Sequence, residues 1–216
     1  MKIKDFSKAF KSGQKFDSKL GNMILNPYHI GDLLLISGEL VACDPLVFPD
    51  TDPFFAKLPP NRYPVILSIA YNYNTGQYTN AFAMLHVSAN PPVGWALVTK
   101  AGEEIHLLPD DRVFGYGVDS GIGCFMDKVA ARAIVDSIWN TETYEDSLLY
   151  QIEESLEKNT NFICTVMNSV LDRYTEVNII AFTSGIGDGF YPSYFGYDIE
   201  NNIVNVVTPF LSGKFL

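Results

Sequence analysis

The chain has 216 residues, of which 47% are hydrophobic and 19% are charged, an ordinary composition for a folded globular protein. Its 25 acidic and 15 basic residues give a net charge of −10, which disfavours binding to phosphate backbones and to anionic membrane surfaces. The composition therefore excludes a mostly disordered chain and predicts no nucleic-acid partner and no membrane. The partners that this charge favours are a small cationic ligand, a metal ion or a basic protein.

The cysteines and the lengths of the apolar runs indicate the cellular compartment and the cofactors that we expect. The three cysteines, Cys43, Cys124 and Cys164, are odd in number and have no paired spacing, and no run has the length of a signal peptide or a membrane span. These features predict reduced thiols and a cytoplasmic location. No Cys/His pair has the spacing of zinc ligands, so we expect no cofactor, with a divalent cation left open.

The first twenty residues are polar and basic and differ in composition from the rest. Phe6 and Phe10 lie four positions apart, which predicts a short helix that docks on the domain and ends at Gly13. We therefore divide the chain into an N-terminal docking segment, 1–20, and a single α+β domain, 21–216.

Strand patterns fill the next part of the chain. An apolar run over 33–44 stops at an Asp-Pro pair and is followed by a proline-rich connection. The apolar runs 64–71 and 78–88 flank Asn74-Thr-Gly76 and predict a hairpin, to which 94–99 would add a third strand.

Two helical patterns occupy the middle of the chain, over 128–139 and 144–158, and Asp127 is a suitable N-cap for the first. Strand patterns return at 177–182, 194–197 and 203–208. Strands on both sides of a helical pair, joined by hairpin-type turns, predict an α+β fold. We expect a mostly antiparallel curved sheet or half-barrel with two central helices packed on one side.

Two short segments, 114–127 and 182–192, place glycines, a Ser-Gly pair and acidic residues between large apolar side chains. Glycine occurs where the backbone needs a positive φ or where another group approaches closely. We predict that the two segments form turns that meet in the fold and build one site. The residues expected to contact a ligand are Asp119, Ser120, Gly121, Cys124, Ser184, Gly187, Asp188 and Tyr191.

The familiar patterns of nucleotide and nucleophile sites do not fit these segments. A dinucleotide fingerprint that begins at Gly121 would need a glycine at the position of Met126. Neither Ser120 nor Ser184 lies in a G-x-S-x-G motif, and neither segment contains a histidine. Cys124, activated by a histidine from elsewhere in the fold, stays open as a nucleophile.

Clustered carboxylates are the remaining candidate chemistry, because Asp119, Asp127 and Asp188 each lie at the edge of a glycine turn. Asp44 begins the loop after an early strand and is a further carboxylate of this kind. Convergent carboxylates bind hard cations, or supply an acid and a base for hydrolysis. Each of the first three also has an architectural interpretation, as a helix N-cap for Asp127 and as a turn residue for Asp119 and Asp188. We expect a non-enzymatic binding module with an acidic, glycine-rich site. The alternatives are a hydrolase that uses the three aspartates, with or without a divalent metal, and purely architectural turns.

Four segments, 38–45, 62–65, 114–127 and 184–192, occur in an order that resembles a bacterial family catalogued as a domain of unknown function, number 4241. The resemblance covers about residues 30–212 and implies one coherent domain. It brings no assigned activity, cofactor or catalytic residue. Ile186 stands at a position where members of that family often carry tryptophan.

Overall fold

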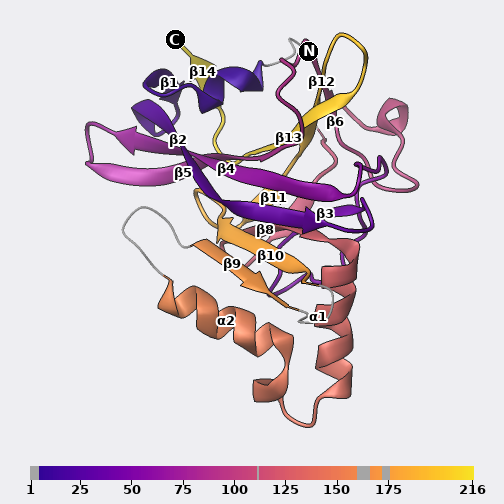
Figure 1. The fold of residues 1–216 in the computed structure, drawn as a ribbon. Helices are drawn as coiled ribbons and strands as arrows, with labels where there is room; N and C mark the ends of the chain where they lie inside the picture. Colours follow the sequence, from indigo (N-terminus) through magenta and orange to yellow (C-terminus); the bar gives the residue numbers. More distant parts are fainter. Residues whose placement is uncertain (1–4, 111, 160–165, 172–175) are drawn as a thin grey trace.

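The computed structural model describes residues 5–110, 112–159, 166–171 and 176–216. An eight-stranded sheet curls into a half-barrel, and a four-stranded sheet lies between it and two helices (Figure 1). All strand pairings among the described residues are antiparallel. The predicted α+β class with a curved antiparallel sheet is therefore confirmed.

The half-barrel has the strand order β14-β1-β2-β4-β5-β13-β12-β6. Its strands in chain order are β1 (Gln14–Ser18), β2 (Gly21–Leu35), β4 (Asn61–Asn72), β5 (Gln77–His86), β6 (Gly94–Leu97), β12 (Tyr194–Tyr197), β13 (Ile203–Pro209) and β14 (Gly213–Phe215). The smaller sheet has the order β3-β8-β10-β9 and consists of β3 (Leu40–Cys43), β8 (Ile122–Asp127), β9 (Val166–Val170) and β10 (Asn178–Thr183). A two-stranded ribbon pairs β7 (Tyr116–Val118) with β11 (Gly189–Tyr191).

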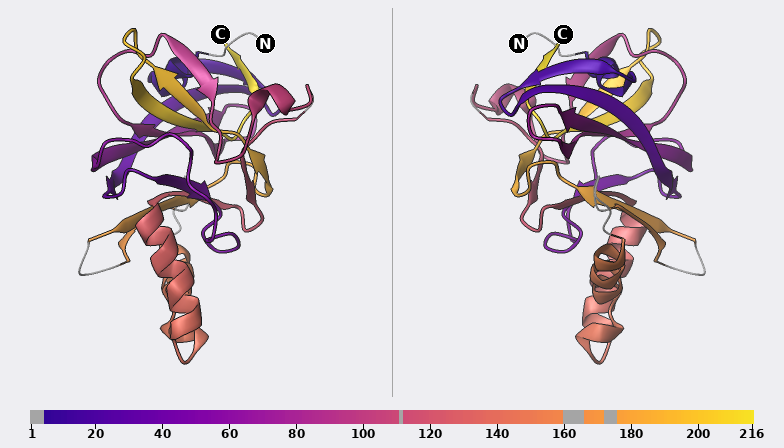
Figure 2. Two further views of the ribbon diagram at one scale, coloured as in Figure 1. Left: turned by 90° about the vertical axis from the view of Figure 1, so that its right-hand side faces the viewer. Right: turned by 90° about the vertical axis from the view of Figure 1, so that its left-hand side faces the viewer.

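The helices are α1 (Lys128–Asn140) and α2 (Leu148–Lys158), with the 3₁₀-helices η1 (Phe6–Phe10), η2 (Ile105–Leu107) and η3 (Tyr144–Asp146). The helix pair extends away from both sheets (Figure 2). The second helical pattern begins as η3, and α2 itself starts after Ser147, whose hydroxyl accepts a hydrogen bond from the Tyr150 amide. Both predicted helices are thus present.

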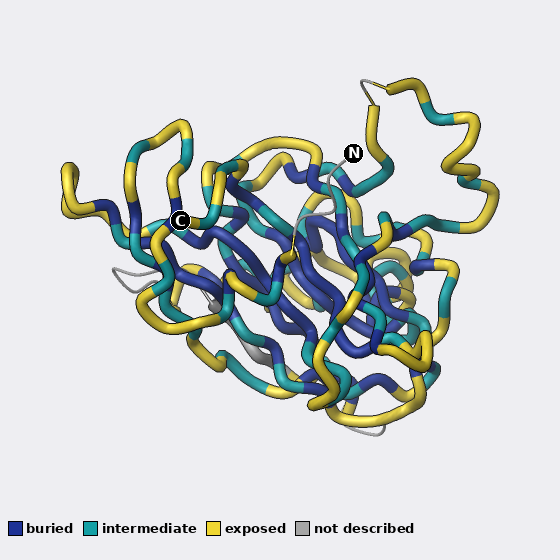
Figure 3. The backbone as a smooth tube through the Cα atoms, turned by 90° about the horizontal axis from the view of Figure 1, so that it is seen from above, coloured by how far each residue is buried: buried dark blue, intermediate teal, exposed yellow. Residues whose placement is uncertain are grey.

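Three strands of the smaller sheet, β3, β8 and β10, are buried on both faces, which explains their continuous apolar runs. On β3, Leu40 and Ala42 face the half-barrel, whereas Val41 and Cys43 face the helices. The strands β8 and β10 alternate in the same way, because successive side chains of a strand point to opposite faces. Figure 3 shows the buried backbone at the centre of the sheets and the exposed loops around it.

A third apolar cluster covers the other face of the half-barrel and includes η1. The expected docking helix is thus a 3₁₀-helix, and Phe6 is buried against Trp95, with ring centroids 5.2 Å apart. After Gly13 the chain enters β1, which pairs with β2 and β14, so this part of the docking segment is a strand of the main sheet. Residues 1–4 lie outside the described residues.

Two strand predictions need correction and one is confirmed. The predicted hairpin is β4–β5. The strand β6, expected beside this hairpin, pairs instead with β12, because β13 occupies the place next to β5. The predicted run 33–44 is two strands in different sheets, separated by a bend at Ser37-Gly38. The bend lets one apolar run contribute to both sheets.

The bend predicts a specific effect of substitution at Gly38. Gly38 has φ of +75°, and a Cβ there would collide with the Leu58 carbonyl oxygen, whereas Gly76 has φ of +71° and open space around it. We expect Gly76→Ala to cost only the left-handed backbone penalty, roughly 1–2 kcal/mol. Gly38→Ala adds the collision and should lower the free energy of unfolding by more, as measured by urea denaturation. Equal losses would contradict this account of the bend.

Candidate functional site

The structure brings the two glycine segments together. The pairing of β8 with β10 and of β7 with β11 places the turn at Gly121 beside the turn at Gly187. A Cβ on Gly121 would lie 3.8 Å from the Gly187 Cα. The sequence analysis predicted this convergence, and the pairings of both strand pairs confirm it.

Hydrogen bonds within the two turns fix their shape. The buried Ser184 donates its backbone amide to the Gly121 carbonyl oxygen at 2.9 Å, and its hydroxyl oxygen lies 3.0 Å from that oxygen. The same hydroxyl lies 2.7 Å from the Gly187 carbonyl oxygen, which also accepts from the Tyr191 hydroxyl at 2.7 Å. Ser184 and Tyr191 therefore hold the turns, and neither is paired with a histidine as a nucleophile would be.

Asp119 and Asp188 are exposed and lie at the same end of the β7–β11 ribbon. Val118 pairs with Gly189 as the last pair of the ribbon, and each aspartate lies one residue beyond this pair. Neither carboxylate has a hydrogen bond or an ion pair with another described residue. Burial raises the pKa of the Tyr191 hydroxyl, and the Asp188 carboxylate raises it further. The predicted acidic pair thus faces solvent. Ser120 is also exposed, and its hydroxyl accepts a hydrogen bond from the Ile122 amide.

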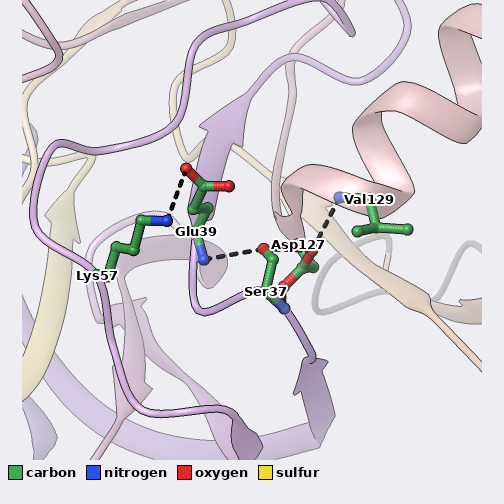
Figure 4. Close-up of polar contacts among 5 residues, drawn as sticks. All are labelled: Ser37, Glu39, Lys57, Asp127 and Val129. Carbon is green, nitrogen blue, oxygen red and sulfur yellow. Dashed lines mark hydrogen bonds and ion pairs between the residues drawn. The ribbon is translucent and has the colours of Figure 1, made fainter.

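Asp127, the third candidate carboxylate, lies at the other end of β8. Five residues of strand, at about 3.3 Å each, separate it from Ile122 by roughly 16 Å. Its Oδ1 accepts hydrogen bonds from the Val129 amide and the Ser37 hydroxyl, both at 2.8 Å (Figure 4). Its Oδ2 accepts from the amides of Ile36 and Ser37, both at 2.9 Å. Asp127 is therefore the N-cap of α1 and an anchor for the bend after β2, and it shares no ligand with the acidic pair.

Asp44 has the corresponding role at the first glycine turn, which the sequence analysis did not identify. It is fully buried, and its Oδ2 accepts hydrogen bonds from the amides of Asp119 and Ser120 at 2.9 and 2.7 Å. Its Oδ1 accepts from Leu46 and Val47, at 2.9 and 3.2 Å. The carboxylate thereby ties the end of β3 to the turn. The Asp-Pro pair that stops the apolar run was the only local signal.

Cys124 lies in the interior and does not face the turns. It is fully buried opposite Cys43 of β3, with 3.7 Å between the two Sγ atoms, and both side chains belong to the cluster that faces the helices. Burial, and then the hydrogen bond with Cys124, raises the pKa of the Cys43 thiol. Cys164 lies outside the described residues. Within the described ranges, no group of three His, Cys, Asp or Glu side chains is placed to hold a metal ion.

A large cavity opens next to the second glycine segment. Its volume is about 740 Å³, and residues of both edge strands, β14 and β6, line it. Since these strands are the two ends of the sheet order, the half-barrel curls around this space and leaves it open. The buried part of the wall is mainly aromatic and apolar and consists of Phe6, Phe16, Phe82, Trp95, Tyr191, Phe210 and Leu211.

The second glycine segment forms part of the mouth of this cavity. Ile186 and Phe190 line it and are 63% and 56% exposed. Gly185, with φ of +75°, lets the turn press against Phe210, because a Cβ there would collide with that side chain. Leu20 and Ile105 are two more exposed apolar residues on the rim. The sequence shows only that Ile186 and Phe190 are apolar residues within a glycine-rich segment, which does not by itself indicate a cavity.

The chain belongs to the family described as protein of unknown function DUF4241, whose model matches residues 33–208. The comparison with curated proteins and the comparison with solved structures found no match. Among the described residues, no helix combines the length and the apolar character that crossing a membrane requires. The family assignment agrees with the resemblance noted from the sequence and supplies no activity.

The buried carboxylate of Asp44 generates a stability prediction. Asp44→Ala would leave four part-buried amides without their acceptor, at about 1–3 kcal/mol for each group that stays unsatisfied. We expect a loss of at least about 3 kcal/mol in the free energy of unfolding, measured by chemical denaturation. The matched control is Asp50→Ala, because Asp50 is an exposed acid of the same loop. If the free energy of unfolding falls by the same small amount in both variants, Asp44 does not anchor the turn.

Proposed function

We propose that this protein is a non-enzymatic binding module that takes an apolar ligand into the cavity between the edges of the half-barrel. The observation that carries this proposal is the cavity itself, at about 740 Å³. Binding sites for small molecules usually measure roughly 300–1,000 Å³ and are lined mainly by apolar and aromatic side chains. Burial of an apolar ligand there is favourable by about 25 cal/mol for each Å² of apolar surface that is removed from water.

The lining favours binding over catalysis. The described residues of the cavity wall include two serines, Ser18 and Ser212, and no histidine or cysteine. A serine nucleophile needs a base within hydrogen-bond reach. Ser18 instead has hydrogen bonds with its own turn, to the Gly21 carbonyl oxygen and from the Leu20 amide. The wall therefore offers apolar contact and shape, and no paired acid and base.

The double turn supports the same proposal, because it fixes two side chains of the mouth. Ile186 and Phe190 are held between Ser184 and Tyr191, which share the Gly187 carbonyl oxygen as acceptor. Such a network lowers the conformational freedom that a binding loop loses when a ligand arrives. The glycine segments thus serve binding through the apolar residues beside them.

A neutral fluorescent probe, N-phenyl-1-naphthylamine, tests the cavity. We expect saturable binding with enhanced emission, weakened about fivefold by Phe190→Ser, because the ring covers part of a bound apolar group. The control is Ile199→Ser, since Ile199 is 88% exposed and does not line the cavity. Both positions are at the surface, so both variants should keep the melting temperature of the native protein. Absence of saturable binding, or equal weakening by both variants, would refute the proposal.

The exposed acidic pair favours a second candidate function, the binding of a cationic group such as a divalent ion or a lysine of a basic partner. Two like charges at the same end of a ribbon repel each other, and a bound cation relieves this repulsion. We expect Ca²⁺ or Mg²⁺ to raise the melting temperature saturably, and Asp188→Asn to abolish the shift. Asp50→Asn, at an exposed acid outside the pair, serves as the control. A shift unchanged in Asp188→Asn would exclude the pair as a ligand.

A further inference from the structure

Basic residues outnumber acidic residues among the described charged residues at the cavity, whereas acidic residues outnumber basic residues in the whole chain. The chain has 25 acidic and 15 basic residues, whereas the described charged residues that line the cavity are Lys19, Arg112 and Asp110. Among these described residues, two thus carry a positive charge and one carries a negative charge, beside a wall that is mainly apolar. In a protein of net charge −10, this local excess of positive charge favours an anion at one place.

Both basic side chains are available to a ligand. Lys19 lies in the turn between β1 and β2, Arg112 lies between η2 and β7, and both are exposed. Neither has an ion pair with another described residue. Long basic side chains lay their apolar stems along apolar surface and keep the charged group in water. A guanidinium group also matches a carboxylate with two parallel hydrogen bonds.

The acidic turn restricts where an anion is stable. Asp188 lies between the mouth residues Ile186 and Phe190 but does not itself line the cavity. Its carboxylate, together with that of Asp119 at the same end of the β7–β11 ribbon, repels an anion from this margin. Among the described residues that line the cavity, Lys19 and Arg112 carry positive charge and Asp110 carries negative charge. The charge pattern therefore gives the ligand an orientation.

We infer that the ligand is a single-chain amphiphile with an anionic head group, its apolar chain inside the cavity and its head group at Lys19 and Arg112. This inference rests on the proposed function of the cavity. Buried aromatic residues such as Phe16, Phe82 and Trp95 provide the apolar end of the site. The open side of the half-barrel lets a chain enter while its head group stays in water.

Three amphiphiles with the same chain and different head groups test this inference by displacement of N-phenyl-1-naphthylamine. They are dodecanoate, dodecanol and dodecyltrimethylammonium, each used below the concentration at which it aggregates. We expect dodecanoate to displace the probe at about three- to tenfold lower concentration than dodecanol, because exposed charged contacts contribute modestly. The cation should be the weakest competitor.

The double variant Lys19→Gln/Arg112→Gln assigns the head-group contact. It should weaken the binding of dodecanoate to the level of dodecanol and leave the binding of dodecanol unchanged. The control is Lys11→Gln/Arg132→Gln, which changes the net charge equally at exposed residues outside the cavity. An equal loss in the control would show a general charge effect and overturn the inference.

The remaining outcomes separate this inference from the proposed function. Probe binding with no preference for dodecanoate, or with a preference for the cation, overturns the head-group inference and leaves the cavity as an apolar site. Failure of the neutral probe to bind removes the proposed function itself. Sedimentation with phosphatidylglycerol vesicles, without displacement of the probe by dodecanoate, would assign the basic residues to a lipid surface and overturn the inference.

Discussion

Two buried carboxylates hold the smaller sheet at the opposite ends of the β3–β8 pair. Asp127 accepts four hydrogen bonds where α1 begins, and Asp44 accepts four where β3 ends. A carboxylate is stable in the interior only when such donors replace its hydration. Since most of these donors are backbone amides of loops, each aspartate turns a flexible connection into a fixed part of the fold. The first glycine turn depends directly on Asp44.

The mouth of the cavity also depends on the hydrogen bonds of Asp44, through a short series of contacts. Asp44 fixes the turn at Asp119 and Ser120, and the neighbouring Gly121 carbonyl oxygen accepts hydrogen bonds from Ser184. Ser184 then orders the second turn, whose apolar residues form part of the cavity mouth. The glycines, serines and acids that are prominent in the sequence are thus mainly the frame of the site. Its contact surface is apolar and comes from residues around them.

Local patterns predicted the elements that depend on neighbouring residues. Asp127 as an N-cap, the apolar stripe of α1 and the turn at Asn74-Thr-Gly76 all concern residues close in sequence. The cavity could not be predicted in this way, because Trp95 and Phe215 meet it from opposite ends of the sheet order. The position of β6 beside β12 likewise depends on which distant strand pairs with β5, and that strand is β13. Long-range pairing, rather than propensity, decided these features.

The open half-barrel leaves two sheet edges without a neighbouring strand, and their dimensions have a consequence for solubility. Free edges can recruit strands from other molecules and start aggregation, and natural proteins counter this with very short edge strands. Here β14 has three residues and β6 has four. Strands this brief offer few main-chain groups to an incoming chain. The short edge strands therefore disfavour pairing between the open sides of two neighbouring molecules.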